Sequence, residues 1–139
     1  MSVDYPEIEK LKQYVKDNEI LVEVLGEAEK HYTFWVELTI NKRSWKLYVD
    51  DEYNDLNAEK PVIALFLILS SLQEYQDSSD YLDWCRISEL EPSDSWLEYY
   101  RSLDEIVKQI ESEIGIIDPL ISQFDYSLNT GVIKALRAL

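Results

Sequence analysis

The most apolar stretch of the chain is Val62–Leu69, which follows Pro61 without a polar interruption. At about 100° per residue, these side chains would point in every direction around a helix, so the helix must be buried in protein or lipid. Eight residues span only about 12 Å of helix, far less than the roughly 30 Å of a bilayer core. Pro61 suits a first helical position, where its missing N–H needs no partner. We therefore predict a buried central helix from Pro61 to about Tyr75.

Ahead of this helix, apolar and polar residues alternate with the period of two that is typical of strands. The pattern is clearest over residues 31–40, and shorter strands are predicted at 20–25 and 44–49. The connections are short, which favours a three-stranded antiparallel meander. One face is apolar and should pack on the central helix. The other face carries Trp35 and Tyr48, large rings that either a later helix or a partner must cover.

The remaining segments have helical spacing. Ile8, Leu11 and Val15 mark an N-terminal helix, and an apolar arc of about 120° runs from Trp96 to Ile114. Caps and breakers predict the following helices: 6–15, 80–90 with Ser78 or Ser79 as cap, 95–114 with Asp94 as cap and Gly115 as terminator, one opening at Asp118-Pro119, and 131–139.

Together, these elements predict one α+β domain over residues 1–139. It has an N-terminal helix, a three-stranded antiparallel meander, a central buried helix and a C-terminal group of three to four helices. Its single cysteine, Cys85, excludes an internal disulfide. The N-terminus lacks a basic run followed by an apolar run, so we expect no signal peptide and a cytoplasmic protein.

The net charge of −15 is unevenly distributed along the chain. Residues 50–113 contain seventeen acidic and four basic residues, whereas the segments on either side are close to neutral. Such a field repels nucleic acid and anionic membranes and attracts basic proteins. Solubility alone is the competing explanation, since many small proteins are acidic for no specific purpose.

Candidate catalytic residues are few. His31 is the only histidine, and it opens a strand beside a charged turn. Cys85 has a neighbouring Arg86 that would lower a thiol pKa, but such a cysteine is more often a small buried apolar residue. The acidic loop from Asp50 fails the EF-hand spacing, with Asp55 sixth and Pro61 twelfth. Three isolated glycines form no phosphate loop. We expect no catalytic residue, cofactor or metal.

What remains is a surface suited to binding, because aromatic rings interleave with the carboxylates of the acidic segment. A core position for these rings is the alternative. The predicted protein-binding residues are Asp50, Asp51, Glu52, Asp80, Tyr81, Asp83, Trp84, Glu89 and Glu91, with Trp35 and Tyr48 as a possible second surface.

Three hypotheses follow. The first is a module that covers a basic partner, like an immunity protein, an antitoxin or a chaperone. Its helix–meander–helix order resembles, by analogy only, the chaperones of bacterial secretion systems, which continue into strands where this chain is predicted helical. The second is a small enzyme or ligand-binding domain with a pocket formed by Tyr48, Asp50, Asp51 and Tyr53. The third is a homo-oligomeric structural subunit that self-associates through Trp35 and Tyr48.

Overall fold

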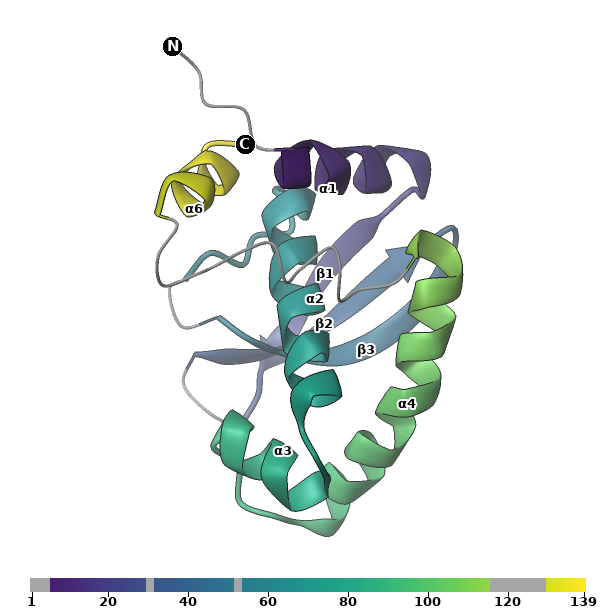
Figure 1. The fold of residues 1–139 in the computed structure, drawn as a ribbon, viewed down its shortest axis with the longest axis vertical. Coiled ribbons are helices and arrows are strands. Elements are labelled where there is room, and N and C mark those ends of the chain that lie inside the picture. The colour runs from purple at the N-terminus through teal and green to yellow at the C-terminus, as the bar shows by residue number, and fades with distance from the viewer. Residues whose placement is uncertain (1–5, 30–31, 52–53, 116–129) are drawn as a thin grey trace.

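The computed structural model describes residues 6–29, 32–51, 54–115 and 130–139, and it confirms the predicted α+β fold (Figure 1). A helix leads into three strands, and further helices follow. The elements are α1 (Pro6–Asp17), β1 (Leu21–Glu27), β2 (Thr33–Ile40), β3 (Arg43–Asp50), α2 (Pro61–Asp77), α3 (Tyr81–Ser88), α4 (Asp94–Ile114) and α6 (Thr130–Arg137).

The three strands form an antiparallel sheet in the order β1-β2-β3, as the short connections predict. Val36 pairs with Leu47 and Leu38 with Trp45, so the side chains of each pair share the apolar face. All four are buried. The register of β1 against β2 shifts between Val24 and Gly26, which marks a bulge in this strand.

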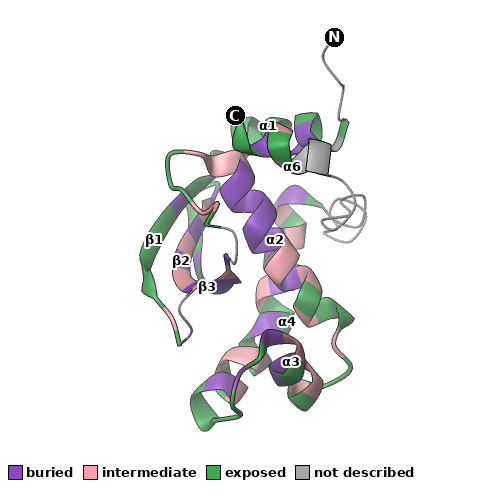
Figure 2. Cartoon of the chain, turned by 90° about the vertical axis from the view of Figure 1, so that its left-hand side faces the viewer, coloured by how far each residue is buried: buried purple, intermediate pink, exposed green. Residues whose placement is uncertain are grey.

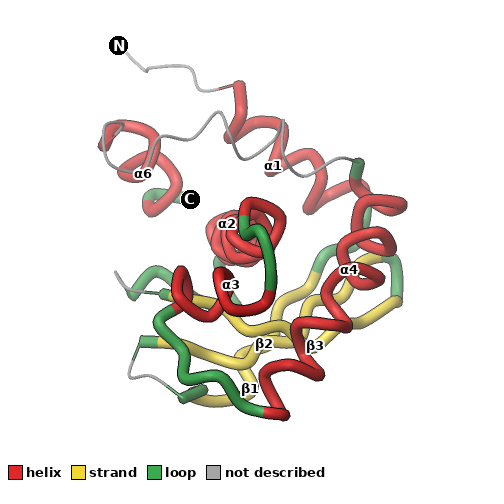
Figure 3. Tube along the Cα trace, turned by 60° about the horizontal axis from the view of Figure 1, so that its bottom comes forward, coloured by secondary structure: helices red, strands yellow, loops and turns green. Residues whose placement is uncertain are grey.

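Helix α2 forms the centre of the core. Residues 63–69 are all buried, in agreement with a helix that is apolar on every side (Figure 2). Figure 3 views α2 nearly end-on, with the sheet on one side and α1 and α6 on the other. Ser70 and Ser71 donate to the carbonyls of Phe66 and Leu67 of the same helix, which satisfies their hydroxyls. Among the described residues, none of the helices combines the length and the apolar character needed to cross a bilayer.

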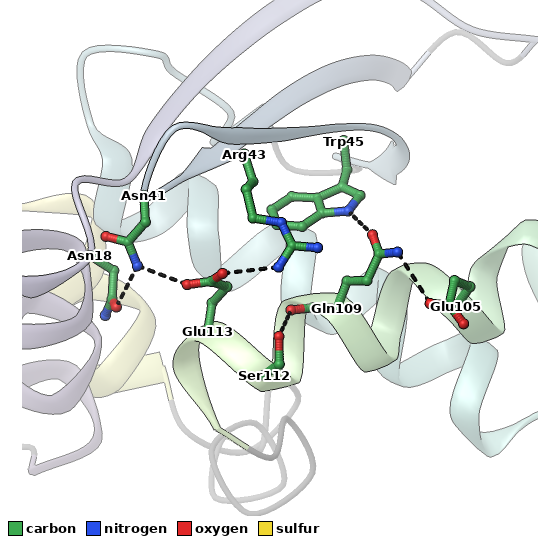
Figure 4. Close-up of polar contacts among 8 residues, drawn as sticks. All are labelled: Asn18, Asn41, Arg43, Trp45, Glu105, Gln109, Ser112 and Glu113. Carbon is green, nitrogen blue, oxygen red and sulfur yellow. Dashed lines mark hydrogen bonds and ion pairs between the residues drawn. The ribbon is translucent and has the colours of Figure 1, made fainter.

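Helix α4 runs along β3 and is anchored to it by side chains (Figure 4). The Trp45 indole N–H donates to Gln109 Oε1 over 2.8 Å, and Glu113 accepts from Arg43 over 3.0 Å and from Asn41 over 2.9 Å. The Asn41 and Arg43 contacts hold the pKa of the Glu113 carboxyl below its usual range. The C-terminal half of α4 is thus tied to the β2–β3 turn, and part of its acidity is neutralised there.

The helix ends show where capping was predicted incorrectly. Asp80, not Ser78 or Ser79, caps α3, since its carboxylate accepts from the Asp83 N–H. Ser93, not Asp94, caps α4 and accepts from the Trp96 N–H. Gly115 ends α4 at φ 95°, as predicted, because a positive φ favours glycine. The helix predicted from Asp118-Pro119 lies outside the described residues.

Candidate functional site

Six exposed carboxylates lie at one end of the molecule. The end of α2, the whole of α3, the α3–α4 loop and the start of α4 meet there (Figure 1). Residues 74–98, which supply this end, contain eight acidic residues and one base, Arg86. We name as the acidic end the exposed carboxylates Asp77, Asp80, Glu89, Glu91, Asp94 and Glu98, together with Leu82.

Part of this charge is used locally to build α3. Asp83 accepts from the Ser79 N–H over 2.9 Å and from the Arg86 guanidinium over 2.6 and 3.1 Å. The Ser79 N–H first, and the Arg86 guanidinium next, lower the pKa of the Asp83 carboxyl. The Asp83 carboxylate therefore interacts with the start of its own helix and with Arg86, the only base of residues 74–98. The field of the acidic end comes from the other carboxylates.

The turn after α3 links the acidic end to the sheet. Glu89 adopts a left-handed backbone at φ 55°, and its N–H bonds back to the Arg86 carbonyl. Its carboxylate accepts from the Tyr32 hydroxyl over 3.3 Å, just ahead of β2. On the other side of the β1–β2 turn, Glu29 accepts from the Trp96 indole N–H over 2.9 Å. The acidic end thus continues onto the tip of the sheet.

Sequence reasoning missed the contribution of Glu27 and Glu29 to this surface. Residues 1–49 are close to neutral as a segment, which concealed them. Most bases of that segment lie in α1 and around the β2–β3 turn, whereas every charged residue within 19–29 is acidic. A local charge count would have found the signal.

Leu82 is the apolar point of the acidic end. Its side chain is 64% exposed on α3, between Asp80 and Asp83 in sequence. Among the five exposed large hydrophobic residues in the described part of the chain, only Leu21 is more open to solvent. An exposed leucine among carboxylates offers apolar contact next to charge, which is the usual composition of a binding patch.

The two aromatic residues of the predicted surface are buried to different extents. Trp84 is buried, with 3% of its area exposed, and it packs against Trp96 at a centroid distance of 6.0 Å. Tyr81 is half-buried, and its hydroxyl donates to the Ser93 carbonyl and accepts from the Ser93 N–H. Both rings hold α3 against the start of α4. The prediction that Trp84 faces a partner was wrong, because this ring is in the core. For the half-buried Tyr81 a binding role stays a prediction.

The second predicted surface is covered by α4. Trp35 stacks on Trp96 with centroids 5.6 Å apart, and Tyr99 meets it edge-on at 5.3 Å. Tyr48 is buried, and Trp96 lies against it at 4.9 Å. A later helix rather than a partner therefore covers these rings. Self-association through Trp35 and Tyr48 would require α4 to leave the sheet.

The acidic loop after β3 is a structural turn in its described part. Asp51 is buried, and its carboxylate oxygens accept from the N–H groups of Asp55 and Leu56 over 2.7 and 2.9 Å. Burial raises the pKa of the Asp51 carboxyl. Asp51 therefore shapes the loop from inside and does not reach a partner. Glu52 and Tyr53 lie outside the described residues.

The pocket predicted from Tyr48, Asp50, Asp51 and Tyr53 is not found among the described residues, which do not include Tyr53. Tyr48 and Asp50 line a cavity of about 10 Å³ between β3, α2 and α4, and Asp51 is not part of it. Such a cavity has room for a single water molecule, not for a substrate. Two larger open hollows, of about 400 and 380 Å³, involve none of these three residues.

Metal and nucleophile chemistry find no support in the described residues. No group of three or more histidine, cysteine, aspartate or glutamate side chains is close enough there to hold a metal ion. Cys85 is buried in the core, with 2% of its area exposed. His31 lies outside the described residues.

Comparison with known proteins gives no functional guidance. Searches with the sequence and the structure found no matching family model, curated protein or solved structure. The function is therefore argued from the geometry and charge of the chain itself.

Proposed function

We propose that the protein is a binding module that uses the acidic end to cover a basic protein partner, in the manner of an immunity protein, an antitoxin or a chaperone. The observation that carries this proposal is the exposed acidity of residues 74–98, which Arg86 alone opposes. Elsewhere, acids of the same segment pair with bases: Glu113 with Arg43, Asp104 with Lys108 and Asp55 with Arg137. Residues 74–98 thus carry a local excess of negative charge.

The physical role of such a surface is steering and selection. A cluster of negatively charged carboxylates raises the association rate for a cationic partner and repels anionic partners. Exposed ion pairs contribute little affinity individually, so an apolar contact such as Leu82 is needed to hold the complex. Because Trp84 is buried and Tyr81 is half-buried, we assign this apolar contact to Leu82.

Capture of basic proteins from a cell extract at two salt concentrations tests the proposal. At about 0.05 M salt the immobilised protein should retain proteins of high isoelectric point, and at about 0.5 M it should release them, since the Debye length shortens severalfold. The test variant neutralises the acidic end with Glu91→Gln, Asp94→Asn and Glu98→Gln.

The matched control removes three exposed carboxylates elsewhere, on α1 and ahead of α2: Glu9→Gln, Asp17→Asn and Glu59→Gln. Both variants change the net charge equally. Loss of capture in the first and retention in the second supports a localised binding end. Equal loss of capture in both variants would indicate that the acidic residues serve solubility only. Capture of no basic protein would refute the proposal.

A further inference from the structure

The two edges of the sheet differ. Two N–H groups in the C-terminal half of β3 are bonded by helix side chains: Tyr48 N–H donates to the Tyr99 hydroxyl over 2.8 Å, and Asp50 N–H to the Ser71 hydroxyl over 3.4 Å. Strand β1 is the opposite edge, and among the described residues no element pairs with its outer side (Figure 2). An uncovered edge is a template for an added strand.

Strand β1 also presents apolar side chains to solvent. Leu21 is 67% exposed, Leu25 45% and Val24 38%. These are three of the five exposed large hydrophobic residues in the described part of the chain. Leu21 lies on the outer face of the sheet opposite Thr39, and Val24 on the inner face opposite Val36. A strand added beside β1 would meet apolar contacts on both faces.

The charges along this edge have one sign. Glu19, Glu23, Glu27 and Glu29 are all exposed, and residues 19–29 contain no base. A second copy of the chain would bring like charges together on top of two net charges of −15. A basic segment would find a carboxylate at intervals along the strand. The edge therefore selects for a cationic extended segment and against self-pairing.

We propose that β1 accepts an extended basic segment of the partner as a fourth strand of the sheet. The segment alternates lysine or arginine with apolar residues and pairs with Leu21–Val24, ahead of the bulge. This inference rests on the proposed function, to which it adds the mode of recognition. Main-chain hydrogen bonds supply affinity, Leu21 and Val24 supply apolar contact, and Glu23 within the paired stretch selects the charge. The acidic end, reached through Glu29, steers the approach.

The probe is a short peptide of alternating lysine and valine, added to the full chain at low salt. Its control is the same peptide with N-methyl groups on alternate residues, which keeps every charge but removes the main-chain donors of one edge. Amide hydrogen exchange, followed residue by residue, reports whether β1 amides become protected. The protein variant is Leu21→Lys with Val24→Lys. Its matched control, with the same change in net charge, places lysine at two exposed positions away from β1 and the acidic end: Ala58→Lys with Leu139→Lys.

Strand addition predicts slowed exchange within Leu21–Val24 and binding about tenfold weaker for the N-methylated peptide, which corresponds to about 1.4 kcal/mol. The double lysine variant on β1 should weaken binding more than the control with lysines at positions 58 and 139 does. Equal binding of both peptides without protection of β1 overturns the inference and leaves the proposed function standing. Absence of peptide binding also overturns the inference, while the capture experiment decides the proposed function separately.

Discussion

The indole of Trp35 on β2 lies parallel to the indole of Trp96 on α4, with 15° between the ring planes and 5.6 Å between the centroids. Trp96 also contacts Tyr48, Trp84 and Tyr99 at centroid distances of 4.9 to 6.0 Å. This one side chain therefore joins the sheet, α3 and α4. The structure of the acidic end depends on it, because α3 is held through the same rings.

Replacing Trp96 by alanine should lower the free energy of unfolding by about 3–5 kcal/mol, the usual range for a buried tryptophan. Urea denaturation measures this change. Leu82→Ala is the control, since its exposed side chain should matter by no more than about 0.5 kcal/mol. A Trp96→Ala variant as stable as the control would show that these ring contacts contribute nothing.

The Tyr99 hydroxyl closes the β3 edge, and Tyr99→Phe removes this acceptor while keeping the ring. The Tyr48 N–H would then lack a partner in a part-buried position. We expect a loss of about 1–3 kcal/mol in the free energy of unfolding, the cost of an unsatisfied buried donor. Tyr100→Phe, on the next residue of α4, should change it by no more than about 0.5 kcal/mol. Equal losses in both variants would contradict a specific role for this hydrogen bond.

Alkaline pH should destabilise the fold through Tyr48. Burial raises the pKa of Tyr48 to about 12, because the phenolate would lose its solvation. In the unfolded chain tyrosine keeps its ordinary pKa of about 10, so above that pH the unfolded state loses its proton first. The stabilisation is complete below about pH 10 and is lost as the pH rises to about 12. Urea denaturation across this interval should give a steeper fall for the wild type than for Tyr48→Phe, and identical slopes would refute the assignment.

Periodicity predicted the parts of the fold that depend on it. The apolar run from Val62 to Leu69 and the alternation in β2 each allow one arrangement of buried side chains, and both are found. The apolar arc of α4 likewise predicted its buried face, including Leu103 and Val107. Such patterns need no knowledge of which element lies against which.

To predict the candidate site, one must know which elements pack against one another, and the sequence pattern does not give this. Trp84 and Tyr81 stand among carboxylates in sequence, but successive residues of a helix point about 100° apart. Trp84 therefore faces the core while Leu82 faces solvent. The open β1 edge was equally hidden. This edge is open because α4 packs against β3 and leaves β1 uncovered. No local sequence pattern indicates this tertiary arrangement.

The correction at the start of α4 can be tested by exchanging caps. Ser93 accepts from the Trp96 N–H over 3.2 Å, whereas Asp94 is the first helical residue. Ser93→Ala should cost about 1 kcal/mol of unfolding free energy, and Asp94→Ala about 0.3–1 kcal/mol through the helix dipole. Added salt should reduce the Asp94 effect and leave the Ser93 effect unchanged, because only the former is a charge interaction. The reverse salt dependence would restore Asp94 as the cap.

Arg137 fastens α6 to the loop ahead of α2. Its guanidinium contacts both carboxylate oxygens of Asp55 over 2.7 and 3.0 Å, and the Asp55 side chain is only 7% exposed. Lys60 donates to the Arg137 carbonyl over 2.8 Å. Removing the guanidinium leaves a shielded carboxylate without its charged partner, so Arg137→Ala should cost about 1.5–3 kcal/mol. Amide exchange in α6 should accelerate in Arg137→Ala and stay unchanged in Lys134→Ala, an exposed cation of the same turn; the same exchange rates in both would show that packing alone holds the helix.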